Sequence, residues 1–256
     1  MKQKIGLFIE NYVRNYREMK GARTEWGEPV VAFADSNDIL FRNLKDIVNI
    51  NHALPSDLLE NAGTVISYFI SFEKAGVMNN VGGTQVSKDW ALAYIETNQL
   101  IADLNNALSE MLKKQGFKSA VAPPTHDFDE KNLVSCWSQK HVAYIAGLGN
   151  FGIHRMIITE RGCCGRLGSL VTNVKIEPTK RKCEESCLYK VDKSCGLCVK
   201  KCIHGALKLD GLDKRACYEV CLETAAIYSS LGLADVCGKC IANVPCSFIN
   251  PRRASK

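Results

Sequence analysis

The sequence predicts an α/β (α+β) fold with two parts: an N-terminal α/β domain over residues 1–178 and a small cysteine-rich domain over residues 179–256. Short apolar, β-branched runs alternate with helical periodicity through residue 178, which is typical of a sheet covered by helices. Ten of the 13 cysteines lie between Cys183 and Cys246, and the first 135 residues contain none. The basic run 180–182 marks the predicted boundary.

The first predicted element is an amphipathic helix over residues 4–20. Apolar side chains recur there at three- and four-residue intervals from Ile5 to Tyr16, and Gly21 provides a stop signal. Apolar β-branched runs and a long Ala-, Leu- and Ile-rich stretch predict the next elements, which are strands over 30–34 and 64–70 and a helix over 87–115. These four elements form the predicted core of the first domain.

A glycine-rich turn follows the next predicted helix, which covers residues 133–146. The turn reads Gly147-Leu148-Gly149-Asn150-Phe151-Gly152. After it, the apolar runs 155–159 and 168–172 flank Glu160-Arg161-Gly162, and this arrangement predicts a hairpin of two paired strands. The predicted order is therefore helix, glycine turn and hairpin.

Composition narrows the compartment and the chemistry of the cysteines. No apolar run approaches the roughly 18–20 residues needed to span a bilayer, and no signal-like segment opens the sequence. We therefore expect a cytoplasmic protein with no membrane partner. In that reducing compartment, dense cysteines indicate metal ligands rather than disulfides, and an odd total agrees.

The cysteines form two related motifs. The first is Cys195-Gly-Leu-Cys198-Val-Lys-Lys-Cys202, which has the spacing of the later part of a bacterial ferredoxin motif, and the second is the longer Cys237-Gly-Lys-Cys240-Ile-Ala-Asn-Val-Pro-Cys246. A C-x2-C loop directs two thiolates to one [4Fe–4S] cubane, whereas the later cysteine ligates the other cluster. The two motifs therefore predict two [4Fe–4S] clusters in a bacterial-ferredoxin-like domain.

Each predicted cluster takes two cysteines from one motif, one from the other motif and one from upstream. The first set is Cys187, Cys195, Cys198 and Cys246, and the second set is Cys202, Cys217, Cys237 and Cys240. Both upstream positions stay open, because Cys183 and Cys221 are alternates in C-x3-C pairs with Cys187 and Cys217. Structural zinc is the alternative metal, but Gly196, Gly205 and Ala206 favour a cubane because small residues let backbone N–H groups reach the sulfurs.

The formal charge of +6 alone would suit a nucleic-acid partner. Two cubanes with four thiolates each would lower the total to roughly +2. We therefore do not expect a nucleic-acid partner.

The glycine turn and the segment that follows it resemble the cobalamin-domain signature of epoxyqueuosine reductases and reductive dehalogenases. The residues that carry the resemblance, and that it implies as cofactor contacts, are Gly147, Leu148, Gly149, Asn150, Phe151, Gly152, Arg155, Arg166 and Gly168. The double-cluster motif downstream strengthens the match. The resemblance covers about residues 30–250, is specific from about residue 140, and matches a short form of that family.

This resemblance implies a nitroreductase-like, cobalamin-type α/β domain that holds cobalamin beside a cluster. The glycines would allow a close backbone approach to the corrin, and Arg155 and Arg166 would meet its propionamides or a substrate anion. The alternative is that the glycines form only a tight helix-to-strand turn.

Two features depart from epoxyqueuosine reductases. Leu133 lies near the position of their proton-donating aspartate, and Asp127 and Asp129 are out of register with it. Their C-terminal repeat extension is also absent. Queuosine is therefore not the expected substrate.

Several other side chains are candidates by type alone. The histidines are possible proton donors, Cys163-Cys164 at the predicted hairpin tip could supply a redox-active thiol, and Cys136 is expected to be buried and inert: His126, His141, His154, Cys136, Cys163 and Cys164.

The leading functional hypothesis is an iron–sulfur reductase that passes electrons to a cobalamin or a substrate at the α/β domain. It would take electrons from a donor such as a ferredoxin or flavodoxin and act on a small molecule or a corrinoid protein. The second hypothesis is a ferredoxin-type electron carrier, or a reductive activator of a corrinoid partner. A zinc-stabilised binding module is the third.

Overall fold

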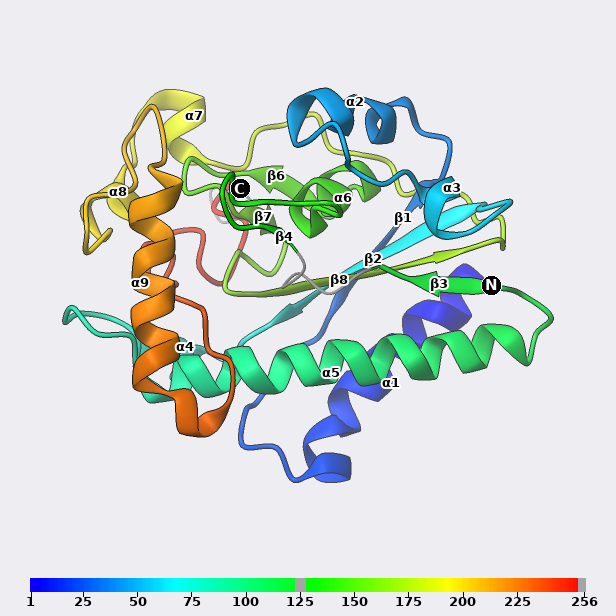
Figure 1. The fold of residues 1–256 in the computed structure, drawn as a ribbon, viewed down its shortest axis with the longest axis horizontal. Coiled ribbons are helices and arrows are strands. Elements are labelled where there is room, and N and C mark those ends of the chain that lie inside the picture. Colours follow the sequence, from blue (N-terminus) through cyan, green and yellow to red (C-terminus); the bar gives the residue numbers. More distant parts are fainter. Residues whose placement is uncertain (123–127, 253–256) are drawn as a thin grey trace.

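A four-stranded antiparallel sheet forms the centre of the computed structural model, which describes residues 1–122 and 128–252 (Figure 1). Its strand order is β1-β2-β8-β3. The strands are β1 (Val30–Asp35), β2 (Thr64–Ser71), β8 (Gly165–Thr172) and β3 (Ser119–Val121). Each neighbouring pair is antiparallel, so the α/β class is confirmed with an antiparallel sheet.

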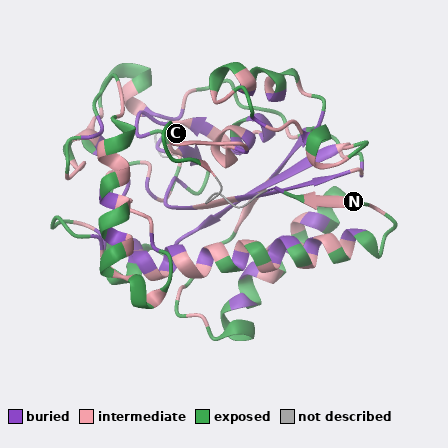
Figure 2. Ribbon diagram, in the orientation of Figure 1, coloured by how far each residue is buried: buried purple, intermediate pink, exposed green. Residues whose placement is uncertain are grey.

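Helices cover both faces of this sheet, and β2 shows why its sequence is apolar throughout. All eight residues of β2 are buried (Figure 2). Alternate side chains point to opposite faces of a strand. Val65 and Phe69 pack toward α2 (Ile39–Ile47) and α6 (Gln139–Ala146). Ile66, Tyr68 and Ile70 pack toward α1 (Lys2–Lys20) and α5 (Lys88–Lys113).

The elements predicted first are confirmed. Helix α1 buries Ile5, Ile9, Val13 and Tyr16 on one face and ends at Gly21, whose φ of 65° suits glycine. Ser87 begins α5 by accepting a hydrogen bond from the Trp90 N–H. Strands β1 and β2 also match the predicted runs to within a residue.

Two later predictions are wrong in part. Residues 133–138 are not helical, because Val134–Ser135 (β5) pairs with Phe128–Asp129 (β4) and Leu133 has a φ of 53°. The predicted hairpin is also replaced: β7 (Ile157–Thr159) pairs with β6 (Gly149–Phe151), whereas β8 pairs with β2 and β3. The run at 168–172 is apolar because it crosses the centre of the main sheet.

The cysteine-rich part packs on one end of the sheet, beside α4 (Lys74–Met78) and α5 (Figure 1). Its helices are α7 (Leu188–Asp192), α8 (Leu197–Lys200), α9 (Lys214–Ile227) and a 3-10 turn (Ser229–Leu231). The short helix α3 (Pro55–Leu58) precedes β2. Trp90, Ile158 and Cys164 share one apolar core with Leu207 and Ile241. The two predicted parts are therefore packed through a common core.

Backbone hydrogen bonds fix this packing. The Cys163 N–H donates to the Cys246 carbonyl at 2.9 Å, and the Cys164 N–H donates to the Ser247 carbonyl at 3.1 Å. Gly162 precedes them with a φ of 80°, and a Cβ there would lie 2.3 Å from the Ser247 oxygen. Only glycine fits this approach. Among the described residues, no helix is both long and apolar enough to cross a membrane.

Candidate functional site

Four cysteines from three segments converge on one small cavity. Cys187, Cys195, Cys198 and Cys246 all line it, together with Ile153 and His154 of the α/β part. Burial, and then the charges of Cys246, Cys187 and Cys195, raise the pKa of the Cys198 thiol to about 12. Thiolates that repel one another in this way are stabilised when a metal site binds them. This group matches the first predicted ligand set.

A second group of cysteines lies where α9 meets the C-terminal loop. Burial raises the pKa of the Cys237 thiol, as do the charges of Cys217 and Cys202. The pKa of Cys240 is also raised, first by burial and then by the charges of Cys237, Cys217 and Cys202. The second predicted ligand set is therefore also gathered in one place.

The two alternate ligands, Cys183 and Cys221, lie in different surroundings. Cys183 is exposed, whereas Cys187 is buried and lines the first cavity. Cys221 lies one turn after Cys217 on α9, and burial together with the charges of Cys217 and Cys237 raises its pKa. The geometry thus favours Cys187 over Cys183, while Cys217 and Cys221 both remain candidates.

Backbone and side-chain donors approach the predicted ligands. The Leu207 N–H donates to the Cys202 sulfur at 3.3 Å, after the turn at Gly205 with its φ of 63°. The Nε2 of His154 lies 3.4 Å from the Cys246 sulfur. Hydrogen bonds to the sulfurs are one of the means by which a protein tunes a cluster.

His154, Cys163 and Cys246 form a buried group at the edge of the first cavity. Their ligand atoms all lie within 4.8 Å of one another. Hydrogen bonding to Cys163 and then to His154 lowers the pKa of the Cys246 thiol, while hydrogen bonding to Cys164 and Cys246 raises that of Cys163. Sequence reasoning placed Cys163-Cys164 at a hairpin tip and so missed this group. The one sequence signal for this group is Gly152. A Cβ at that position would lie 2.6 Å from the His154 ring, so glycine leaves room for the histidine.

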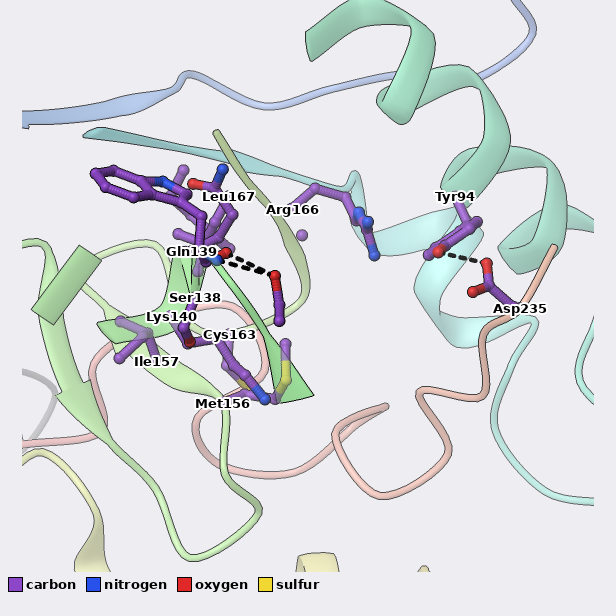
Figure 3. A pocket seen from close by; sticks show the side chains of 14 residues that line it. Tyr94, Ser138, Gln139, Lys140, Met156, Ile157, Cys163, Arg166, Leu167 and Asp235 are labelled. Carbon is purple, nitrogen blue, oxygen red and sulfur yellow. Dashed lines mark hydrogen bonds between the residues drawn. The ribbon is translucent and has the colours of Figure 1, made fainter. Parts of the chain in front are cut away.

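A larger pocket opens between the sheet, the start of α6 and the cysteine-rich part (Figure 3). Its empty volume is about 950 Å³, including space open to solvent. Both apolar and polar side chains line it. The lining residues are Phe69, Tyr94, Ser135, Trp137, Ser138, Gln139, Lys140, Met156, Ile157, Cys163, Gly165, Arg166, Leu167 and Asp235. Cys163 thus borders both this pocket and the cysteine group around Cys246.

Three charged side chains line the pocket, the basic Lys140 and Arg166 and the acidic Asp235. The Arg166 guanidinium lies 4.1 Å from the centre of the Tyr94 ring, and the Tyr94 hydroxyl donates to Asp235 at 2.6 Å. Burial lowers the pKa of Lys140, the nearby charge of Cys217 raises it, and the charge of Arg166 lowers it. Within the described chain, Arg166 Nε and Gln139 Oε1 are buried and have no hydrogen-bond partner.

Several epoxyqueuosine reductases are among the solved structures that are similar to this chain. The enzyme from Bacillus subtilis has a TM-score of 0.55 at 17% identity, covering 94% of this chain and 66% of its own. The Streptococcus thermophilus enzyme has a TM-score of 0.53 at 18% identity, covering 95% and 69%. An epoxyqueuosine reductase bound to a modified tRNA-Tyr stem loop has a TM-score of 0.55 at 18% identity, covering 94% and 66%.

The chain has the epoxyqueuosine reductase fold. It spans about two thirds of the length of these structures, between 66% and 69%. No protein-family model matches the sequence, and no curated protein is similar to it. The resemblance inferred from the glycine turn and the cysteine motifs is therefore confirmed at the level of fold.

Within this epoxyqueuosine reductase fold, the glycine turn is packed against the protein itself. A Cβ at Gly149 would lie 2.1 Å from the Ile158 oxygen, and one at Gly168 would lie 2.4 Å from the Tyr68 ring. Gly147 ends α6 with a φ of 87°. These glycines are thus required by a tight turn and close packing, which was the alternative reading of the motif.

The other five predicted cofactor contacts lie in different surroundings. Leu148 is in the core, Asn150 donates to the Glu184 carbonyl, and the Phe151 ring packs on His141. Arg155 is exposed. Of the nine residues, Arg166 lines the larger pocket.

The remaining candidates lie away from the cysteine groups or outside the described residues. Asp129 is exposed and accepts hydrogen bonds from Asn132, and Cys136 is partly buried in the loop before α6. His141 pairs with the Ser138 hydroxyl, and burial lowers its pKa to about 4. His126 and Asp127 lie outside the described residues.

Proposed function

We propose that the chain is an iron–sulfur oxidoreductase that delivers electrons to a small-molecule substrate in the pocket beside Arg166. It would hold one [4Fe–4S] cluster on Cys187, Cys195, Cys198 and Cys246, and a second on Cys202, Cys217, Cys237 and Cys240. The observation that carries this proposal is Cys163, which lines the pocket and contacts Cys246. The buried Cys163 side chain therefore connects the first cysteine group to the pocket, and an electron could pass along it.

The donor set fits cubanes better than zinc. Eight cysteines form two groups of four, and the C-x3-C step from Cys198 to Cys202 joins the groups, as in bacterial ferredoxins. When bound, such clusters supply electrons one at a time, so an external reductant of the ferredoxin or flavodoxin class would serve the chain. The protein's own contribution is to bury the thiolates, donate hydrogen bonds to their sulfurs and border the pocket.

Cobalamin is not assigned a step, because the predicted cradle does not fit it. The spaces beside Gly149, Gly152 and Gly168 are filled by protein atoms rather than open to a ligand. Queuosine is also not the proposed substrate, since Leu133 stands near the position of the catalytic aspartate and Asp129 is exposed. The proposed substrate is a molecule small enough for the pocket.

A ferredoxin-type carrier, or an activator of a corrinoid partner, is the competing function. Leu197 and Leu209 favour it, because both apolar side chains are exposed next to Cys195 and Cys198, at 41% and 48%. Exposed apolar side chains beside a redox centre are typical of a transient docking surface. Turnover of a small substrate by the purified protein would exclude a pure carrier.

Anaerobic reconstitution with iron and sulfide tests the proposal. We expect about eight irons per chain and a broad visible absorbance that bleaches on reduction. Titration with hydroxocobalamin then asks whether a corrin is retained, and reduction of candidate substrates is followed by reoxidation of the clusters. Zinc binding without iron uptake, or clusters that no small molecule reoxidises, would contradict the reductase.

A further inference from the structure

We infer that the pocket beside Arg166 binds a small organic carboxylate with an apolar body, with Arg166 and Lys140 facing its charged group. This deepens the proposed function by naming the class of substrate, and it rests on that function for the role of the bound molecule.

Two basic side chains, Arg166 and Lys140, and one acidic side chain, Asp235, line the pocket, so the basic residues are in excess. Asp235 accepts the hydrogen bond of the Tyr94 hydroxyl. Bringing two cations together at a partly buried site is costly unless an anion joins them. A carboxylate between Arg166 and Lys140 would offset that repulsion.

The Arg166 guanidinium is held in place by Tyr94, but its Nε–H donor has no acceptor among the described residues. The guanidinium stacks on Tyr94, and Tyr94 is in turn held by its hydrogen bond to Asp235. The Nε of Arg166 is also buried. A buried donor without a partner destabilises a protein, so a ligand that accepts from this donor would remove that cost. A guanidinium fork matches the two oxygens of a carboxylate.

Five apolar side chains line the pocket together with these cations. Phe69, Trp137, Met156, Ile157 and Leu167 all line the pocket (Figure 3). A bare inorganic anion would leave these side chains facing water, whereas an organic acid would cover them. Two basic side chains among several apolar ones therefore favour an amphipathic anion.

A competing explanation is that Lys140 only compensates the negative charge of the second cysteine group. That explanation accounts for the proximity of Lys140 to Cys217. It does not account for the unpartnered Nε of Arg166 or the apolar side chains of the pocket. The two explanations differ in what a ligand does, so binding measurements separate them.

The test is calorimetric titration of the cluster-loaded full chain, under anaerobic conditions, with benzoate and with its neutral analogue benzamide. We expect benzoate to bind at least tenfold more tightly than benzamide. Arg166→Gln and Lys140→Gln should each weaken benzoate binding about tenfold and leave benzamide binding unchanged. Arg161→Gln is the matched control, because Arg161 is exposed, pairs with Glu28 and lies outside the pocket. It should bind benzoate like the parent protein.

Equal affinity for benzoate and benzamide would overturn the inference, and so would variants at Lys140 and Arg166 that keep full benzoate affinity. Inorganic phosphate that binds as tightly as benzoate would also overturn it, because the apolar side chains would then contribute nothing. Retained iron content and visible absorbance show that each variant is folded. A preparation that discriminates benzoate from benzamide without taking up iron would refute the proposed function but support the anion site.

Discussion

The Nε2 of His154 lies 3.4 Å from the Sγ of Cys246, and the tautomer of this histidine is fixed by its other nitrogen. The Nδ1 accepts a hydrogen bond from the Met156 N–H at 3.1 Å, so it carries no proton. In the neutral ring the proton is then on Nε2, which donates to the sulfur. His154 is buried, with 5% of its surface exposed, so water does not replace this donor.

His154→Leu should therefore lower the midpoint potential of one cluster. A hydrogen bond to a ligating sulfur stabilises the more negative, reduced cluster, and removing the donor withdraws that stabilisation. The measurement is potentiometry followed by electron paramagnetic resonance. The potential of the second cluster should not change, since its ligands lie away from His154.

His154→Gln provides the conservative comparison for this effect, because its amide can still donate. We expect a potential between those of the parent protein and the leucine variant. If the leucine variant keeps both potentials, the imidazole does not donate to a cluster ligand. If both clusters are lost instead, His154 is needed for assembly rather than for tuning.

Cys187 and Cys183 should differ in their effect on iron content. Cys187 is buried at the cavity shared with Cys198, whereas Cys183 is exposed. Cys187→Ala should lower bound iron from about eight to about four per chain, because one cubane loses a ligand. Cys183→Ala is the matched control and should keep about eight irons. The opposite result would exchange the two assignments.

Local patterns predicted the elements whose side chains are buried in a regular period. The β2 run is apolar at every position because helices cover both faces, and α1 shows its buried stripe at helical spacing. The helix predicted over residues 133–146 begins six residues too early, because the apolar residues of 133–138 also fit a helical period. There the β4–β5 pairing and the positive φ of Leu133 determine the conformation instead.

The cysteine ligands were predictable because metal spacing is local, but their surroundings were not. His154 and Cys246 are 92 residues apart, and only the docking of the cysteine-rich part on the sheet brings them together. The same docking places Lys140 near Cys217. The larger pocket draws on the sheet, α5, α6 and the loop at Asp235, so no single motif could indicate it.

Gly162→Ala should weaken the docking of the cysteine-rich part. A Cβ would lie 2.3 Å from the Ser247 oxygen, and the φ of 80° disfavours alanine. Overlap with the backbone and a strained φ together should lower the free energy of unfolding by about 2–4 kcal/mol. Thermal unfolding of the cluster-loaded protein measures this change.

Gly6→Ala is the control for this substitution. No atom lies within 4 Å of the added Cβ, and Gly6 lies inside α1. It should stabilise the protein by up to about 1 kcal/mol, because alanine favours a helix more than glycine does. Equal melting temperatures for both variants would show that the contact between Gly162 and Ser247 does not contribute to docking.

Removal of the metal should loosen the cysteine-rich part before the sheet. Helices α7 and α8 have five and four residues, which is too short to be stable without metal or tertiary contacts. Cys187 precedes α7 and Cys198 lies in α8, and both belong to the core that joins the cysteine-rich part to the sheet. Losing the cluster therefore leaves thiols without a metal in that core.

After iron is stripped by a chelator and an oxidant, trypsin should cut first at the basic residues between 180 and 215. The sheet should resist longer, because β2 is buried throughout and makes no metal contact. Simultaneous digestion of both parts would mean that the shared core fails as one unit when the metal is lost.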